Sequence, residues 1–418
     1  MKSNFVDVPT DCPHREKLGF TGDCQVFVPS ALYLMDSYPV IRRWLRELVS
    51  CQDESGCILY IAPPQEGPQS KPMGMDGSAG WSNAITIVPH RIMRTFGTAE
   101  EVREMYPAIK RWIVYNLERS LKSREENESL PEHIRNYILD CANNWGEWCE
   151  PGKTSRDYNI ERQATGHAEI ATAFMALDCL LASDIARGLG ENEDAEFFYD
   201  AYQKTKEAYR YVYTDNGSIN SDRQCHYVRP IVHKLLDGEE NDKAAEDLVK
   251  LVRENNNHIG TGFLTTCHIC DTLSEYGYES VAYDLLLQNE MPSWLYEVEK
   301  GATTVWESWF AIREGSEPRG SHNHYSLGAV SKWMMSGVLG IEALDGKITV
   351  RPRPDRRLGY AKGSYLSPMG KIASGWRYDG DEIVFDIEIP SNTEADIVLP
   401  DGSEHHVAAG KYCFSIKA

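Results

Sequence analysis

The chain has 418 residues, of which 42% are hydrophobic and 25% are charged, so it can bury a large core and form two domains. Its formal net charge of −20 argues against nucleic acid or an anionic membrane surface as a partner. There is no run of 18 apolar residues, which argues against a transmembrane helix.

The cysteines and the N-terminus indicate the cellular compartment and whether the chain binds a metal. Residues 1–5 have no apolar stretch long enough for a signal peptide, and the eleven cysteines are odd in number and thinly spread. We therefore expect reduced thiols and a cytoplasmic protein. Cys267 with Cys270, and Cys141 with Cys149, raise zinc binding as an alternative. However, no second CxxC follows at ribbon spacing, and we expect no metal and no cofactor.

The first distinctive stretch of the chain is a loop rich in acids, residues 10–23. It contains Asp11, Arg15, Glu16 and Asp23, and its proline and two glycines prevent a continuous helix. Such a loop can turn several carboxylates toward one point, where they change each other's pKa. This is typical of an active site, although an ordinary acidic loop can have the same composition.

Downstream of this loop the apolar residues recur with helical spacing. The predicted helical segments are residues 25–36, 39–50, 80–96, 99–121, 163–188, 191–213, 223–236, 240–254, 261–275, 278–288 and 326–338. They form pairs with short joints, and we expect the longer inserts to gather on one face and build a site. These inserts are residues 51–79, 122–162 and 290–325.

Six such hairpins would form an (α/α)6 barrel, but eleven segments leave that barrel one helix short. Residues 1–10 are too short and too weakly periodic to supply a helix before residue 25. Either one helix escapes the count or the barrel lacks its first helix. An incomplete barrel would expose apolar faces of its first and last helices, which favours a homodimer. We also expect low activity unless another chain covers the gap.

Beyond about residue 340 the apolar period changes to two, which predicts strands. The expected strands are residues 347–352, 371–378, 382–389, 395–399 and 411–416, with a hairpin turn at Asp379-Gly380. The sequence therefore predicts a catalytic helical domain over residues 1–340 and an antiparallel β-sandwich over residues 341–418.

Tryptophans accompany carboxylates in the long inserts. Trp145 and Trp148 flank Glu147, Trp306 and Trp309 flank Glu307, and Trp81 follows Gly80. Proteins hold sugars in this way, because an aromatic ring stacks on the apolar face of a pyranose while carboxylates accept hydrogen bonds from its hydroxyls. Any one of these tryptophans could instead pack its loop on the barrel.

Two carboxylates are the minimum for hydrolysis of a glycosidic bond. Glu16 has acidic neighbours, which suits a carboxyl group that keeps its proton and acts as an acid. Glu307 provides a second carboxylate that could activate water. His324 could hydrogen-bond either the sugar or a carboxylate, or serve the fold alone.

Residues 11–23 resemble the DCPxRExxGWxGD motif of the family 78 α-L-rhamnosidases. The similarity continues in order through Gly80-Trp81, Trp145-Gly146-Glu147-Trp148, Thr261-Gly262-Phe263, the segment 303–309 and Asn323-His324-Tyr325. It extends to the β segment at 348–352 and so covers essentially the whole chain.

The resemblance implies an (α/α)6 catalytic barrel and an inverting mechanism. By position, Glu16 matches the general acid and Glu307 the general base. The remaining matched positions hold the rhamnose, tune the acid or line the pocket: Asp11, Arg15, Phe20, Asp23, Trp81, Trp145, Glu147, Trp306 and His324. The implied substrate is a rhamnosylated carbohydrate or glycoside.

The chain departs from the family pattern at three points. Phe20 replaces the tryptophan of the motif and removes an N–H donor, and Asn83 stands where many members have an acid. Family members also usually carry β domains and the first barrel helix before the acidic loop. Two alternatives therefore stay open, namely another (α/α)6 sugar hydrolase, such as one acting on uronic acids, and a non-catalytic or weakly active truncated carbohydrate-binding homologue.

Overall fold

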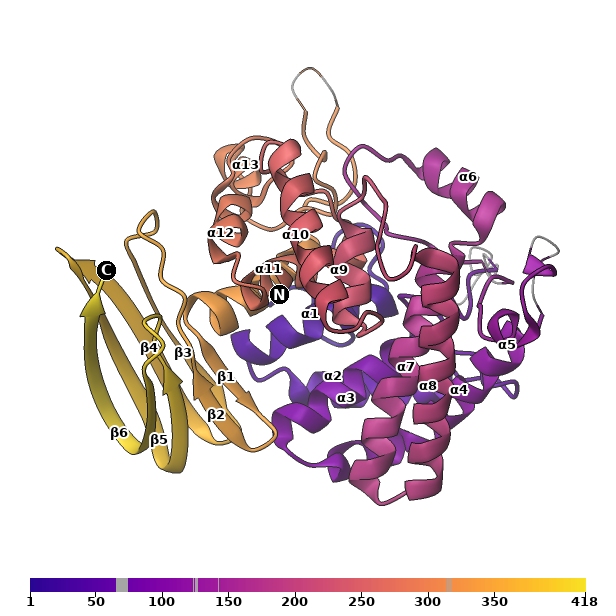
Figure 1. Ribbon diagram of the computed structural model, residues 1–418, viewed down its shortest axis with the longest axis horizontal. Coiled ribbons are helices and arrows are strands. Elements are labelled where there is room, and N and C mark those ends of the chain that lie inside the picture. The colour runs from indigo at the N-terminus through magenta and orange to yellow at the C-terminus, as the bar shows by residue number, and fades with distance from the viewer. Residues whose placement is uncertain (65–73, 123, 125–126, 142, 314, 316) are drawn as a thin grey trace.

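A computed structural model describes residues 1–64, 74–122, 124, 127–141, 143–313, 315 and 317–418. A large helical part is followed by a β sheet that lies against one side of it (Figure 1). The inserts predicted at 51–79, 122–162 and 290–325 fall partly outside the described residues. No helix in the described part of the chain is both long and apolar enough to span a membrane.

The helical part comprises the following elements: α1 (Thr21–Leu34), α2 (Tyr38–Ser50), α3 (Ala84–Phe96), η1 (Ala99–Met105), α4 (Tyr106–Ser120), α5 (Glu132–Arg135), α6 (Ser155–Thr165), α7 (Ala168–Leu189), α8 (Asn192–Tyr213), α9 (Cys225–Val232), α10 (Glu239–Glu254), α11 (Phe263–Glu275), α12 (Glu279–Leu287), α13 (Trp294–Glu299), η3 (Ser326–Val330), α14 (Ser331–Trp333) and η4 (Met334–Val338). All eleven predicted helical segments are present. Local signals set many of the ends, such as Pro39 in the first turn of α2 and Gly190, in a left-handed conformation, after α7.

Six of these elements form a closed inner ring. α1 packs on α3, α3 on α7, α9 on α11, and η3 on both α11 and α1. The buried pair between Arg229 of α9 and Glu169 of α7 joins the two halves. α1 buries twelve of its 14 residues, whereas α10 buries four of 16 because it presents only one face to the core.

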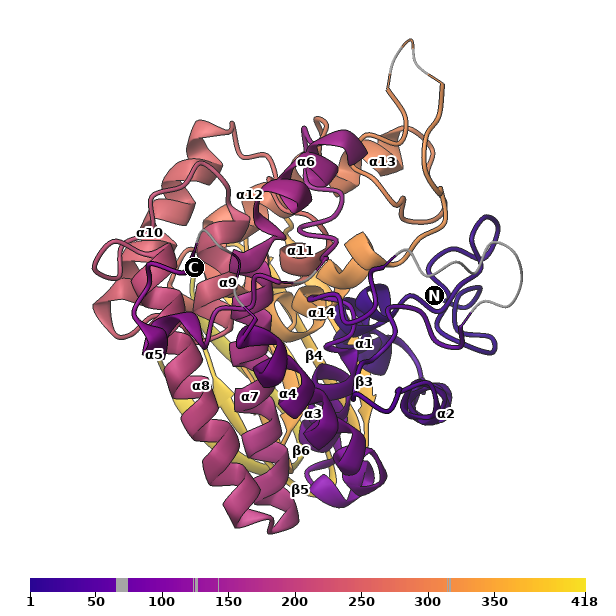
Figure 2. The ribbon, with the colours of Figure 1, turned by 90° about the vertical axis from the view of Figure 1, so that its right-hand side faces the viewer.

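The outer layer holds five longer helices in the described part of the chain. α2 packs on α3, α4 and α8 on α7, α10 on α9, and α12 on α11. The antiparallel pair α7 and α8 is the clearest hairpin in both views (Figures 1 and 2). The helical domain is thus the predicted six-hairpin barrel with a complete inner ring, and among the described residues no helix fills the outer position beside α1.

The outer side of α1 is covered by other parts of the same chain, contrary to the expected exposed face. Phe5 is 5% exposed and packs on Phe27 of α1 and on Tyr325, with ring centroids 6.1 and 5.6 Å apart. Tyr33 of α1 donates a hydrogen bond of 2.9 Å to the carbonyl of Ile341 at the start of the sheet. Exposed apolar side chains on this helix are confined to its C-terminal end, at Leu34 and Met35.

The C-terminal part is a β domain, as predicted. Its strands are β1 (Ile341–Leu344), β2 (Lys347–Val350), β3 (Tyr360–Ser367), β4 (Gly370–Asp379), β5 (Glu382–Val398) and β6 (Glu404–Lys417). They are hydrogen-bonded in the order β1-β2-β5-β4-β3 with β6 on β5. All pairs are antiparallel except β2 with β5, which is parallel.

Strand β5 merges two strands that were predicted separately. An irregularity between Ile389 and Glu394 interrupts its pairing with β6, and both strands continue past it. They thereby connect the β1–β2 half of the domain with the β3–β4 half. The short strand β1 and the glycine-containing strand β3 were not predicted, because neither has a sustained apolar alternation.

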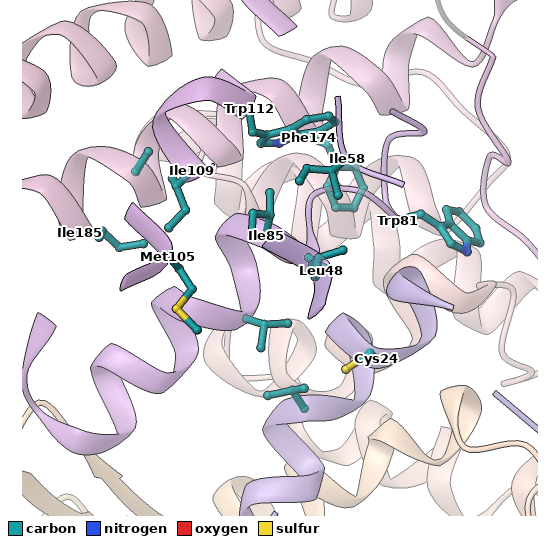
Figure 3. Packing of buried hydrophobic residues seen from close by; sticks show 14 of the residues in the cluster. Cys24, Leu48, Ile58, Trp81, Ile85, Met105, Ile109, Trp112, Phe174 and Ile185 are labelled. Atoms are coloured by element: carbon teal, nitrogen blue, oxygen red, sulfur yellow. The ribbon is translucent and has the colours of Figure 1, made fainter. Parts of the chain in front are cut away.

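Two large apolar clusters hold the molecule together. One fills the barrel between α1, α3, α4 and α7, and Figure 3 shows part of it, from Ile185 on the left to Trp81 on the right. The second cluster runs without interruption from α9, α11 and α12 into the sheet and includes Trp333 and Trp376. The chain passes from helix to strand between Val338 and Ile341, but the buried core continues across this boundary.

Candidate active site

A small cavity lies where the acidic loop meets the segment around Glu307. It measures about 130 Å³ and is lined by Asp11, Arg15, Glu16, Phe20, Asp23, Trp81, Trp145, Trp148, Phe263, Glu307 and His324. Nine of these residues were predicted as site residues from the sequence. The fold therefore gathers side chains from positions 11 to 324 around one small opening.

The acidic loop is held in shape by Asp11. The Asp11 carboxylate accepts hydrogen bonds from the Leu18 amide at 3.0 Å and from the Cys12 thiol at 2.8 Å, and the Asp11 amide donates to the Leu18 carbonyl. Gly19 is required at the end of the loop because a Cβ there would lie 2.1 Å from the Ala62 carbonyl oxygen. Asp11 is 2% exposed, and burial raises the pKa of its carboxyl group.

Glu16 has the properties of a carboxyl group that keeps its proton near neutral pH. Burial raises its pKa to about 7, and the negative charges of Asp11 and Glu307 act in the same direction. The Arg15 guanidinium opposes this shift and lies 2.9 Å from the Glu16 carboxylate.

Arg15 also contacts the second carboxylate of the cavity. Its other terminal nitrogen donates to Glu307 at 3.1 Å, so one guanidinium group spans both glutamates. Glu307 accepts a further hydrogen bond of 2.7 Å from the Ser321 amide, and the Glu307 amide donates to the Ser321 carbonyl. A contact of 3.4 Å between His14 and the Ser321 hydroxyl ties the two loops together a second time.

A buried acid–histidine pair forms another side of the cavity. His324 lies 3.1 Å from Asp23, and the Ser326 hydroxyl donates to the same Asp23 oxygen at 3.0 Å. Burial by itself would lower the pKa of His324, but the hydrogen bond and charge of Asp23, with Glu307 and Asp11 nearby, raise it. The Ser326 amide donates to the other ring nitrogen of His324 at 3.4 Å, so both nitrogens have partners and the ring holds Asp23 in place at the cavity wall.

Aromatic rings line much of the remaining wall. Trp81 and Trp145 have ring centroids 6.1 Å apart, and Trp145 meets Trp148 edge-on at 5.6 Å. Phe263 packs on His324 at 5.2 Å. Trp148 and Phe263 were not predicted as site residues, although both stand in motifs that the sequence comparison had already singled out.

Two predicted site residues lie outside the cavity. Glu147 is fully buried, and its carboxylate binds Arg229 at 2.7 Å and the amide and hydroxyl of Thr265 at 2.9 and 2.7 Å. It fastens the Trp145–Trp148 loop to α9 and α11, so its negative charge is already compensated. Trp306 is 2% exposed and stacks on His322, while its amide donates to Glu297.

One group of side chains in the described part of the chain is close enough to share a metal ion. Ligand atoms of Asp11, Cys12 and Glu16 lie within 4.8 Å of one another. Burial raises the pKa of the Cys12 thiol to about 11, and this thiol donates to Asp11, so the group is satisfied by its own hydrogen bonds. The thiols of Cys267 and Cys270 donate to two different carbonyls, those of Leu264 and Ala282, and do not converge on one point.

Comparison with known proteins gives matches along nearly the whole chain. Residues 1–338 match the model of the bacterial alpha-L-rhamnosidase 6 hairpin glycosidase domain, and residues 346–413 match that of the bacterial alpha-L-rhamnosidase C-terminal domain. An alpha-L-rhamnosidase of Alteromonas sp. (strain LOR) is 33% identical over 413 residues, which is 96% of this chain and 42% of that protein. One of Streptomyces avermitilis is 31% identical over 96% of this chain and 36% of its own length.

Solved structures agree with these matches. The structure of the Streptomyces avermitilis alpha-L-rhamnosidase complexed with L-rhamnose superposes with a TM-score of 0.86 at 29% identity, over 99% of this chain and 40% of that one. The Aspergillus terreus alpha-L-rhamnosidase gives 0.88 at 27% identity, over 100% and 48%. The chain thus spans less than half the length of these relatives.

Proposed function

Because this chain belongs to the bacterial α-L-rhamnosidase family, glycoside hydrolase family 78, we propose that it hydrolyses terminal α-L-rhamnose from glycosides or polysaccharides with inversion at the anomeric carbon. The observation that carries the proposal is the pair Glu16 and Glu307, which face one small cavity and are bridged by Arg15.

In this mechanism Glu16 is the general acid. It donates its proton to the glycosidic oxygen as the bond from that oxygen to C1 breaks, and the aglycone leaves as an alcohol. A pKa of about 7, raised mainly by burial, keeps a large fraction of Glu16 protonated at neutral pH.

Glu307 is the general base. Its carboxylate removes a proton from a water molecule whose oxygen bonds to C1 on the face opposite the departing aglycone, so the product is β-L-rhamnose. Arg15 donates to both carboxylates, so both face the same opening. Inversion requires them to stand roughly 6.5–9.5 Å apart, which leaves room for the water.

The other cavity residues bind the sugar. Asp23 offers an acceptor for its hydroxyls, His324 orients Asp23, and Asp11 supports the loop that carries the acid. The tryptophan wall supplies the apolar surface that the methyl group of rhamnose requires. These roles agree with a cavity that is apolar on one side and rich in carboxylates on the other.

Hydrolysis of an aryl α-L-rhamnoside by the wild type, Glu16→Gln and Glu307→Gln tests the proposal. We expect each substitution to lower kcat by about 10²–10⁴-fold while the protein stays folded, since each removes one proton-transfer step. Wild-type levels of turnover in either variant would refute the assignment. A folded wild type that binds L-rhamnose without hydrolysis would favour the carbohydrate-binding alternative.

A further inference from the structure

The turn that carries Trp81 is held by side chains from distant helices. Trp81 is 3% exposed and its ring forms part of the cavity wall, and the preceding Gly80 has a left-handed backbone with φ of 79°. There is little space for another ring position, because a Cβ on Gly22 would lie 2.7 Å from the Trp81 ring. A small change in this turn would therefore move a wall of the sugar pocket.

Both polar groups of the Gly80 backbone are bound by side chains. Its amide donates to the Asn83 side-chain oxygen at 2.6 Å, and its carbonyl accepts a hydrogen bond from Gln25 of α1. The neighbouring Ala79 amide donates to Asn144 at 2.7 Å. Asn83 was noted in the sequence as a position where many family members have an acid, yet it lies beneath the turn and does not face the cavity.

Asn83 is in turn oriented by a buried acid on α7. Asp178 is 1% exposed, and one of its oxygens accepts hydrogen bonds of 2.6 Å from the Asn83 amide nitrogen and of 2.6 Å from the Trp112 indole. Figure 3 shows Trp112 near Phe174 in this core, with Trp81 farther to the right. Burial raises the pKa of Asp178 to about 7, against the effect of the Trp112 and Asn83 hydrogen bonds.

The chemistry of these groups fixes the direction of the whole chain of hydrogen bonds. An indole N–H can only donate, so the Asp178 oxygen that it meets must accept. The Asn83 amide nitrogen must then face Asp178, which leaves the Asn83 oxygen toward the Gly80 amide. The reversed amide would bring its NH₂ group against the Gly80 N–H and lose both hydrogen bonds.

We propose that Asn83 and Asp178 are positioning residues that hold Trp81 in the wall of the rhamnose pocket. This inference rests on the proposed function for its effect on catalysis, but not for its effect on Trp81. Neither residue reaches the cavity, so their loss changes how the sugar is held and leaves Glu16 and Glu307 in place. The expected signature is a raised KM with kcat little changed.

Asn83→Ala is the main test, and Ser374→Ala is its matched control. Ser374 is also buried, at 1% exposed, and donates one hydrogen bond to the Leu339 carbonyl, but it lies in β4 of the sheet. Asp178→Asn retains an acceptor for the Asn83 amide and the Trp112 indole, whereas Asp178→Leu removes that acceptor. Incorporation of 5-fluorotryptophan, with the Trp81 resonance assigned from Trp81→Phe, reports the environment of the ring without any substrate.

We expect the Trp81 fluorine resonance to shift or broaden in Asn83→Ala and Asp178→Leu and to stay unchanged in Asp178→Asn and Ser374→Ala. With an aryl α-L-rhamnoside, KM should rise about tenfold in Asn83→Ala while kcat changes less than about threefold. An unchanged resonance in Asn83→Ala, or an equal shift in Ser374→Ala, would overturn the inference. If the wild type hydrolyses no rhamnoside, the proposed function fails, and the resonances alone decide the positioning role.

Discussion

Arg15 connects the two glutamates on which the chemistry depends. Its guanidinium lies within hydrogen-bonding distance of both Glu16 and Glu307 and is half-exposed, so it reaches the cavity from the solvent side. Its positive charge lowers a pKa that burial and the neighbouring carboxylates raise. Arg15 therefore sets how much of Glu16 carries a proton at a given pH.

The pH dependence of kcat/KM should reveal this coupling. Glu16 must be protonated to act as an acid, so kcat/KM should fall as the pH rises through about 7. In Arg15→Gln the falling limb should move to higher pH, because a charge that favours the ionised carboxylate is gone. Lys17→Gln, which alters an exposed neighbour, should leave the limb in place. A limb that stays fixed or moves to lower pH in Arg15→Gln would contradict this account.

Glu147 shows why residue type is easier to predict than side-chain direction. Glu147 stands between two tryptophans, Trp145 and Trp148, that line the cavity. However, Arg229, whose cation Glu147 binds, lies 82 residues away and belongs to no motif, so this pairing could not be read from the sequence. Trp306 was also predicted to line the pocket, but its neighbour Glu307 is the residue whose side chain turns toward the cavity.

Removing the charge of Glu147 should therefore destabilise the protein rather than only weaken sugar binding. Glu147→Gln leaves the fully buried Arg229 with one carboxylate partner instead of two. We expect a loss of about 3–5 kcal/mol in the free energy of unfolding, measured by urea denaturation. Glu196→Gln, on the exposed face of α8, should change it by less than about 0.5 kcal/mol. A Glu147→Gln protein as stable as the wild type would show that the buried pair is dispensable.

At the scale of elements, periodicity predicted the helices well and the sheet less well. The helical segments were found because apolar residues recur at helical spacing in each, over the most turns in α7 and α8. β1 has only four residues, and β3 contains a glycine and exposes half of its side chains, so neither shows a sustained apolar pattern. The closure of the inner ring through η3 and α1 joins the two ends of the helical domain and could only be inferred from the fold class.

The N-terminal segment acts as part of the wall around α1. Phe5 packs against Phe27 and Tyr325, whose own rings are in contact, whereas the adjacent Val6 is 76% exposed. Phe5→Ala should lower the free energy of unfolding by about 3–5 kcal/mol, and Val6→Ala should change it by less than about 0.5 kcal/mol. Equal effects of the two substitutions in urea denaturation would show that this segment contributes no specific packing to α1.

At the scale of the whole molecule, the barrel and the sheet share one buried core. The second apolar cluster joins α11 and α12 to β4 and β5, and Tyr33 links α1 directly to the start of the sheet. The β domain thus helps to cover the barrel beside α1, where the count of helices had predicted an exposed apolar face. The expectation of a homodimer and of low activity rested on an exposed apolar face beside α1, and this face is covered. We predict that the 418-residue chain is active by itself.

The stereochemistry of the first product distinguishes inversion from retention at the anomeric carbon. An aryl α-L-rhamnoside is incubated with the wild-type chain, and the anomeric proton of the released sugar is followed by NMR before mutarotation. We predict that β-L-rhamnose appears first and converts slowly to the equilibrium mixture, because Glu307 activates a water on the face opposite Glu16. Initial release of α-L-rhamnose, or no release by the folded chain, would contradict the account.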